Sequence, residues 1–197
     1  MKRWSSIVVM LLAAACSDGE SSSGAGGEAA GAGGAGGEGG APPDYSALYT
    51  CEELVFAEAK ELSGPGYDPT NGFVGTPQAS YVVHATQIYY RPEGETEFFQ
   101  LAGKVAAQLA QTEGLVAFSL GTDDTCGVAR TMGVWASEEA MYAFVGSGAH
   151  AEAMAKTSDI TFTGRTTHWD ATPEEVEALT WDVARDKLED IEPLDFY

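Results

Sequence analysis

The segment from residue 81 to residue 169 constrains the fold most, because runs typical of strands and helices alternate there in one order. Four runs rich in β-branched and aromatic residues predict strands, and two intervening runs have the apolar spacing of helices. The predicted strands are residues 81–90, 115–120, 126–135 and 160–169, and the predicted helices are residues 95–113 and a helix capped by Ser137. This β-α-β-β-α-β order predicts a ferredoxin-like α+β fold with an antiparallel sheet.

Further helices are predicted on both sides of this core. The segment Thr50-Cys51-Glu52-Glu53 has capping-box spacing and predicts a leading helix to about Leu62, so residues 44–79 are expected to hold this helix and a loop. Residues 80–197 form the expected domain, in which Thr172-Pro173-Glu174-Glu175 opens one last C-terminal helix. Three predicted strands carry apolar residues on both sides. The sheet face away from the helices therefore needs a cover, and a second copy of the sheet is the simplest one.

The start of the chain predicts export. Met-Lys-Arg, an apolar run too short to span a bilayer and three alanines form the pattern of a signal peptide over residues 1–15. Cys16 after small residues resembles a bacterial lipobox, which implies a lipid on its thiol, and by the rule known for enteric bacteria Ser17 implies the outer membrane. We expect an envelope lipoprotein that faces the periplasm or the exterior, with a plain secreted protein cut near Ala15 as the alternative. Residues 16–43, rich in Gly, Ala, Ser and Glu, are expected to form a flexible tether.

Charge and cysteine usage limit the partners and the redox state. The formal net charge of −20 repels nucleic acid and anionic lipid headgroups, so no nucleic-acid partner is expected. With Cys16 lipidated, Cys51 and Cys126 remain as a pair in an oxidising compartment, which predicts a disulfide between them. One buried and one exposed free thiol are the alternative. A metal pair is disfavoured, because neither cysteine has a second Cys or His at ligand spacing.

Residues 132–150, MGVWASEEAMYAFVGSGAH, resemble the antibiotic biosynthesis monooxygenase superfamily, also called the dimeric α+β barrels. Its members often read Trp-x-Ser-x-Glu-Ala, then an apolar stripe and a small residue before His, and the resemblance extends over roughly residues 80–170. It implies a homodimer whose two sheets face each other as a barrel, and in several members a ligand cavity between the sheet and its own helices. The superfamily holds cofactor-free oxygenases, haem degraders, isomerases and proteins of unknown role, so it indicates fold more strongly than function.

The first functional hypothesis is a cofactor-independent monooxygenase that acts on a small aromatic or quinol compound. Such enzymes deprotonate an electron-rich substrate and let the carbanion react with oxygen, which needs acid–base groups and aromatic walls. His150 and His84 are the candidate catalytic residues. The candidate ligand-pocket residues are Tyr89, Trp135, Phe144, Met154 and His168. The same aromatic residues also suit a packed core, so whether the protein is catalytic stays open.

Haem and metal binding are the second and third hypotheses. In the haem-degrading branch a helix aromatic and a later His flank the porphyrin; here Phe144 matches the aromatic but Met154 stands where the His is expected, which disfavours degradation. His84 and His168 lie at strand ends that meet in this fold, where they could bind a metal, titrate as a pair or form a polar edge. No carboxylate or third His clearly joins them, so we expect no metal site and no cofactor, with a bound metal or weakly bound haem as the alternative.

The last hypothesis is a non-catalytic module of the cell envelope that binds a small hydrophobic ligand or another protein. No Gly-rich phosphate loop, nucleophile elbow or zinc-protease helix occurs in the sequence. His150 follows Gly146-Ser147-Gly148, so its default role is that of a cationic ring at a helix C-terminus, and an acid, base or ligand facing the cavity is the alternative. Arg130 and Arg165 are expected to pair with carboxylates.

Overall fold

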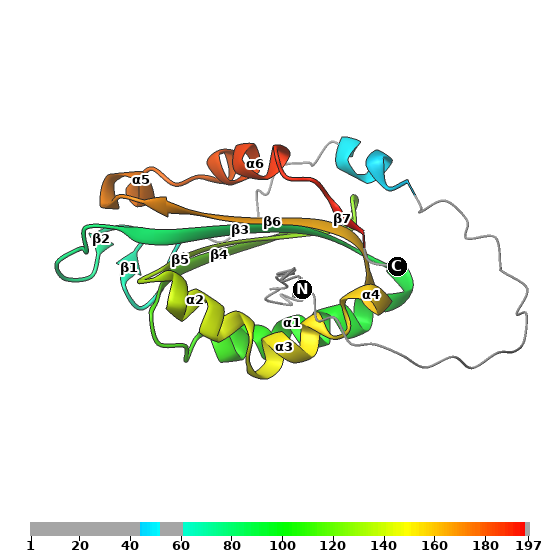
Figure 1. Cartoon of the computed structure of the whole chain (residues 1–197), viewed down its shortest axis with the longest axis horizontal. Coiled ribbons are helices and arrows are strands. Elements are labelled where there is room, and N and C mark those ends of the chain that lie inside the picture. The colour runs from blue at the N-terminus through cyan, green and yellow to red at the C-terminus, as the bar shows by residue number, and fades with distance from the viewer. Residues whose placement is uncertain (1–43, 52–60, 196–197) are drawn as a thin grey trace, which may run out of the picture.

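The computed structural model describes residues 44–51 and 61–195. The predicted signal peptide, the lipidation site Cys16 and the tether over 16–43 lie outside the described residues, and so do residues 52–60 of the predicted leading helix. The described chain forms one main sheet with helices on both faces (Figure 1). In chain order the elements are η1 (Ser46–Thr50), β1 (Tyr67–Asp68), β2 (Gly72–Phe73), β3 (Tyr81–Tyr90), η2 (Pro92–Gly94), α1 (Glu95–Leu109), β4 (Leu115–Asp123), β5 (Val128–Trp135), α2 (Glu138–Val145), α3 (Gly148–Met154), α4 (Thr157–Ile160), β6 (Thr161–Ala171), α5 (Pro173–Glu177), α6 (Trp181–Glu189) and β7 (Leu194–Asp195).

The main sheet is antiparallel and has the strand order β4-β5-β3-β6-β7. Without the two-residue β7, this is the order of the ferredoxin-like β-α-β-β-α-β fold, which confirms the predicted α+β class. β3 spans the predicted residues 81–90, and all ten of its residues are buried. Its β-branched and aromatic composition suits this central place in the sheet.

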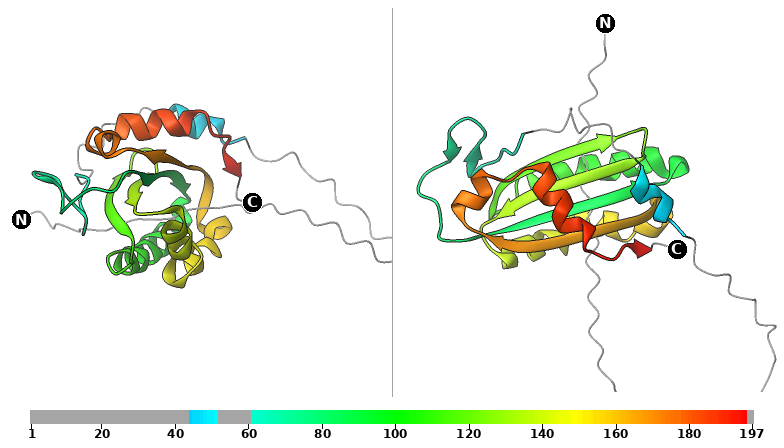
Figure 2. Two further views of the ribbon diagram at one scale, coloured as in Figure 1. Left: turned by 60° about the vertical axis from the view of Figure 1, so that its left-hand side comes forward. Right: turned by 90° about the horizontal axis from the view of Figure 1, so that it is seen from above.

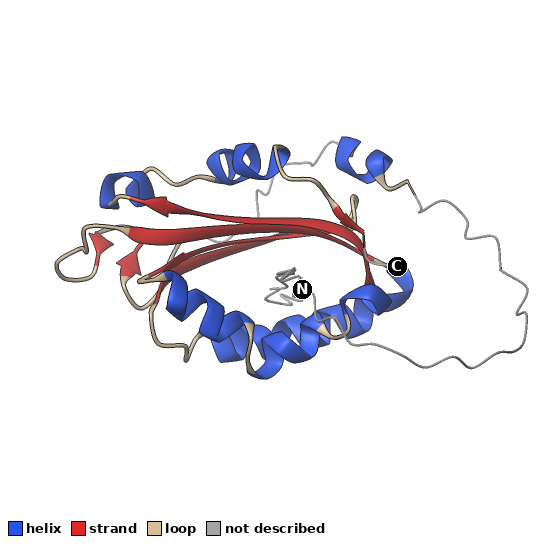
Figure 3. Cartoon of the chain, in the orientation of Figure 1, coloured by secondary structure: helices blue, strands red, loops and turns tan. Residues whose placement is uncertain are grey.

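Helices α1 to α4 cover one face of the sheet, here called the inner face (Figures 1 and 3). Side chains alternate along a strand, so every second residue of β3 from Val82 onward points to this face. α1 packs against it with an apolar stripe that has the helical spacing on which the prediction of residues 95–113 rests: Phe98, Leu101, Val105 and Leu109. The helix ends at Leu109, before the predicted residue 113, and the turn that follows runs to Gly114, whose φ is +83°.

The opposite face, here called the outer face, is covered by the chain itself rather than by the second sheet that we expected. α5 and α6 lie across it, with η1 near one end (Figures 1 and 2). Val176 of α5 lies in one apolar cluster with Val83 and Val134, and Leu188 of α6 lies in another with Ala85. The segment after β6 therefore buries apolar side chains that would otherwise need a partner.

Most of the predicted leading helix, residues 52–60, lies outside the described residues. Before that gap, Thr50 ends the 3₁₀ helix η1, and its hydroxyl donates to Ala47 O at 2.8 Å. Ser63, just beyond the predicted end at Leu62, pairs with Phe118 at the edge of β4. The predicted loop that follows contains the short β1–β2 hairpin.

The predicted C-terminal helix begins as expected and then breaks. Thr172 and Glu175 form a capping box with Pro173 in the first turn of α5. α5 is short, however, and Thr180 caps a second helix, α6, by accepting a hydrogen bond from Val183 N. The break lets α6 follow the outer face of the sheet.

Cys51 and Cys126 form the predicted disulfide, which joins positions 75 residues apart. It fastens the segment after η1 to the turn between β4 and β5, beside Tyr89 and Val128. Within the part of the chain that the structure describes, none of the helices combines the length and apolar character that a membrane crossing requires.

Candidate functional site

Four buried rings from four different elements form a row between the sheet and the helices. His84 of β3, Trp135 of β5, Phe144 of α2 and His150 of α3 have ring centroids 6.0, 5.3 and 4.9 Å apart in that order. None of the four side chains is more than 1% exposed. We call this set the ring cluster. It contains both histidines that were predicted as catalytic candidates and two of the five predicted pocket residues.

The sheet register explains why His84 fits into this interior. His84 stands opposite Gly133 on β5 and diagonal to Trp135, which is paired with Val82. A Cβ atom at Gly133 would lie 2.8 Å from His84 Nδ1, so the imidazole lies directly over this glycine. The missing side chain at position 133 therefore provides the space for the ring.

The hydrogen bonds of His84 decide its protonation. The Trp135 indole Nε1–H donates to His84 Nδ1 at 2.7 Å, so Nδ1 is the acceptor and the proton of the neutral ring is on Nε2. Burial, with smaller effects from the charges of His150 and His168, lowers the pKa of His84 from 6.5 to about 3. His84 Nε2 is buried and has no hydrogen-bond partner among the described residues. His84 is therefore a neutral ring that presents an N–H donor to the interior.

His150 has the opposite tautomer. Its Nδ1 lies 2.9 Å from Val145 O, and because a carbonyl can only accept, Nδ1 carries the proton. Burial lowers the pKa of His150 from 6.5 to about 4, although the bond to Val145 opposes this shift. The ring does bind the C-terminal carbonyl of α2, but as a neutral donor and not as the cation that we predicted. It lies in the first turn of α3, fully buried against Phe144.

Gln108 is a supporting residue that the sequence did not reveal. From α1 its Oε1 accepts a hydrogen bond from His150 N at 3.1 Å, and its Nε2 donates to Ser147 O at 3.1 Å. One side chain thus holds the junction between α2 and α3 in place. The contact joins residues about 40 positions apart in the chain, so no local sequence pattern indicates it.

A second polar atom without a partner lies on the same face of the sheet. Thr131 is buried, stands opposite Thr86 and is diagonal to His84. Thr86 exchanges a hydrogen bond with Thr166 at 3.0 Å, whereas Thr131 Oγ1 has no partner among the described residues. The inner face therefore offers a hydroxyl at the strand position diagonal to His84.

The predicted pairing of His84 with His168 is confirmed by the register of β3 and β6. The two rings have different surroundings, however, because the His168 side chain is 41% exposed and its Nε2 lies 3.2 Å from Glu138 Oε1. The Tyr142 ring packs edge-on against it. Within residues 44–51 and 61–195, no group of three or more His, Cys, Asp or Glu side chains is placed to hold a metal ion.

The other predicted site residues lie elsewhere. Met154 packs, half-buried, against the inner-face core. Tyr89 points to the outer face, where it packs against Tyr49 and accepts a hydrogen bond from Gln87 Nε2 at 2.6 Å, so it cannot line a site with the ring cluster. Arg165 was expected to pair with a carboxylate. Its guanidinium lies instead over the Tyr49 ring at 4.2 Å, and no described carboxylate forms an ion pair with it.

The segment that contains the ring cluster matches a known protein family. Residues 81–156, which hold β3 to α3 and the whole ring cluster, match the family model of the antibiotic biosynthesis monooxygenases. This part of the chain belongs to that superfamily, as residues 132–150 predicted. No curated protein matches the chain.

Several solved structures are similar to the chain. A structure from Fusobacterium nucleatum is 16% identical, covers 56% of this chain and 46% of its own, and has a TM-score of 0.44. One from Lactobacillus acidophilus is 15% identical, covers 50% of each chain and has a TM-score of 0.42. The chain thus spans about half the length of these two proteins. SnoaB of Streptomyces nogalater, a cofactor-independent oxygenase, is 17% identical over 48% of this chain and 93% of its own, with a TM-score of 0.39.

Proposed function

We propose that the domain binds a small aromatic compound that carries an oxygen substituent, such as a phenol, quinol or quinone. The oxygen accepts a hydrogen bond from His84 Nε2, and the aromatic ring packs against Trp135 and Phe144. The observation that carries this proposal is the buried N–H of His84, which no described residue accepts.

The energetics favour an oxygen-bearing ligand over a pure hydrocarbon. A buried donor without an acceptor costs about 1–3 kcal/mol, and a ligand oxygen would recover this free energy. Thr131 Oγ1 lies on the same face and offers a second contact. The neighbouring aromatic rings would give a small aromatic ligand that enters this interior apolar groups to pack against.

The tautomer of His84 favours a role in ligand binding over a role in catalysis. Its basic lone pair on Nδ1 already accepts the indole N–H, so His84 donates a hydrogen bond and is not a general base. His150 has its lone pair on Nε2, but with a pKa of about 4 it is a weak base near neutral pH. Ligand binding is therefore the function that the geometry supports best.

Oxygenation without a cofactor is the second candidate, and the family match over residues 81–156 favours it. A phenol with a conjugated CH₂ group would lose a proton from this carbon, aided by the hydrogen bond from His84 to its oxygen. The carbanion would then react with one O₂, which converts CH₂ to C=O and releases one H₂O, so that atoms and electrons balance. In the ring cluster, the nitrogen that would take up this proton is Nε2 of His150.

Calorimetric titration with naphthoquinone, its quinol and naphthalene tests the proposal. His84→Asn keeps an acceptor for the Trp135 indole and removes the Nε2–H donor. We expect it to weaken binding of the oxygen-bearing probes by about 5- to 150-fold and to leave naphthalene unaffected. His168→Asn, at the exposed histidine, is the matched control.

Equal affinity for naphthalene and its oxygenated forms, or unchanged affinity in His84→Asn, would refute the hydrogen bond. The N–H would then be satisfied by water alone. The oxygenase candidate requires in addition that an oxygen electrode records O₂ uptake with an anthrone substrate and that the uptake stops without protein.

The start of the chain bears on where in the cell the domain acts. We propose that a lipid on Cys16 holds the domain in the bacterial cell envelope, at the outer membrane, as the lipobox resemblance suggests. Metabolic labelling with a radioactive fatty acid should mark the wild-type chain and not Cys16→Ser. An unlabelled wild-type chain in the culture medium would favour the secreted alternative. The predicted homodimer depended on a sheet face that α5 and α6 cover in the structure.

A further inference from the structure

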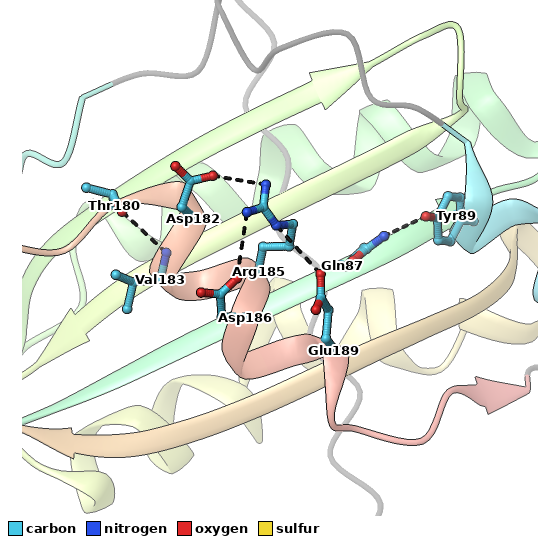
Figure 4. A network of polar contacts seen from close by, with 8 residues as sticks. All are labelled: Gln87, Tyr89, Thr180, Asp182, Val183, Arg185, Asp186 and Glu189. Carbon is cyan, nitrogen blue, oxygen red and sulfur yellow. Dashed lines mark hydrogen bonds and ion pairs between the residues drawn. The ribbon is translucent and has the colours of Figure 1, made fainter.

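The side chains at the centre of the outer face are as buried as those of a protein core. Val83, Ala85 and Val134 are 0% exposed and Met132 is 2% exposed. The buried polar Gln87 on the same face donates its amide to the Tyr89 hydroxyl (Figure 4). Neither the apolar area nor this polar group is left for another molecule.

The segments that pack on the outer face, here called the cover, lie before and after the ferredoxin-like core in the chain. α6 runs over the middle of the sheet, where Ala184 and Leu188 join the cluster of Ala85 and Met132 (Figure 2). α5 and the residues after it cover one end with Val176 and Leu179. At the other end Leu48, Tyr49 and Cys51 pack against Tyr89 and Val128.

The cover is held in place by directional contacts. Thr172 and Thr180 cap α5 and α6, and Leu194 and Asp195 of β7 pair with β6 at the sheet edge. The Cys51–Cys126 disulfide fixes the N-terminal part. Arg185 contacts Asp182, Asp186 and Glu189 on the solvent side of α6 (Figure 4), which leaves the apolar side of the helix for the sheet.

The edges of the sheet are also partly occupied. Ser63 exchanges two backbone hydrogen bonds with Phe118 of β4, and Gly66 N donates to Val116 O. β7 pairs with β6 on the far side. Strand addition by a second copy at these positions would therefore have to displace part of the chain.

We propose that the protein is a monomer in solution, in which residues 172–195 take the place that a second sheet would occupy in a barrel. A stable interface buries about 1,200–2,000 Å² of accessible surface, but the outer-face side chains of the central strands β3 and β5 have almost none to offer. The formal charge of −20 per chain also opposes the association of two copies at low salt. This inference is independent of the proposed ligand.

Analytical ultracentrifugation of the chain from residue 17 onward tests the proposal. We expect the mass of one copy from about 1 to about 100 µM, at both about 0.15 M and about 0.5 M salt. A dimer at either salt concentration overturns the proposal. A dimer only at high salt would mean that charge, and not the cover, keeps the copies apart.

A pair of variants tests the role of α6. Ala184→Asp/Leu188→Asp places charges on its buried side and should loosen it, so that the folded protein becomes a concentration-dependent dimer. Asp182→Asn/Asp186→Asn removes two ion pairs of Arg185 on the exposed side, which contribute little to stability, and should remain a monomer. A folded Asp variant that stays monomeric, with α6 accessible to protease, shows that the cover is not what prevents pairing. If that variant does not fold, the mass of the wild-type chain still decides.

Discussion

The hydrogen bond from the Trp135 indole to His84 Nδ1 controls the chemistry of the ring cluster. It determines which nitrogen of His84 carries the proton, and therefore that the ring presents a donor to the inner face. Both groups are fully buried, so neither can exchange the partner for water without local opening.

Removal of the indole N–H tests this contact. Trp135→Phe leaves His84 Nδ1 buried without a donor, and we expect the free energy of unfolding to fall by at least about 1–3 kcal/mol. Urea unfolding measures the loss, and nitrogen NMR shifts of the imidazole report the tautomer. Trp169→Phe, at a half-buried outer-face position, is the control and should leave the tautomer unchanged. An unchanged His84 spectrum in Trp135→Phe would contradict the assignment.

The buried histidines should make the protein less stable in mild acid. Between pH 6.5 and about 4 the unfolded chain protonates His150 while the folded chain does not, so stability falls as the pH falls. Above pH 6.5 both states are neutral and this effect is absent. His150→Asn keeps a donor for Val145 O without a titrating group. Its free energy of unfolding should therefore fall less steeply, by up to about 1.4 kcal/mol per pH unit.

Urea unfolding at a series of pH values between about 5 and 7.5 provides the comparison. His168→Asn, at an exposed ring, should keep the wild-type pH dependence. A wild-type slope that His150→Asn leaves unchanged would mean that His150 titrates alike in the folded and unfolded chains, so that burial does not lower its pKa.

At the scale of elements, helix caps decide where the helical segments begin. Ser137 caps α2 as predicted, by accepting a hydrogen bond from Ala140 N, and the capping box opens α5. Thr180 is also a residue type that favours the N-cap position. Its role became evident only in the structure, because the residues before it have a helical pattern as well.

The cap at Thr180 can be tested on its own. Thr180→Ala removes the acceptor of the Val183 N–H, and we expect a loss of about 0.5–2 kcal/mol in the free energy of unfolding. Thr180→Ser retains the hydroxyl and should stay close to the wild type. If chemical denaturation finds the Ala and Ser variants equally stable, the cap does not contribute to holding α6 on the outer face.

At the scale of the whole molecule, the disulfide joins the N-terminal segment to the sheet. Its closed loop of 75 positions restricts the unfolded chain, so reduction should lower the free energy of unfolding by about 2–4 kcal/mol. Thermal unfolding with and without reductant measures this effect, and Cys51→Ser/Cys126→Ser should match the reduced protein. A reductant-induced loss in that double variant would point to a cause other than this disulfide.

The sequence predicts most of the elements and part of the site. Strand 81–90 agrees with β3 to the residue, because its continuous β-branched and aromatic run leaves no competing pattern. His84, Trp135, Phe144 and His150 were all candidates and do meet. Tyr89 was a candidate for the same reason, but one step of strand alternation places it on the opposite face. Gln108 and Thr131 could not be predicted, since their roles depend on contacts across the fold.

Local patterns in the sequence determined the strands, the first helix turns, the ferredoxin-like order and the cysteine pair, because turn, cap and periodicity signals act over a few residues. Only the tertiary structure decided what covers the outer face, which tautomer each buried histidine has and which polar atoms lack partners. These properties depend on residues far apart in the chain, whose distances and burial are set when the layers pack.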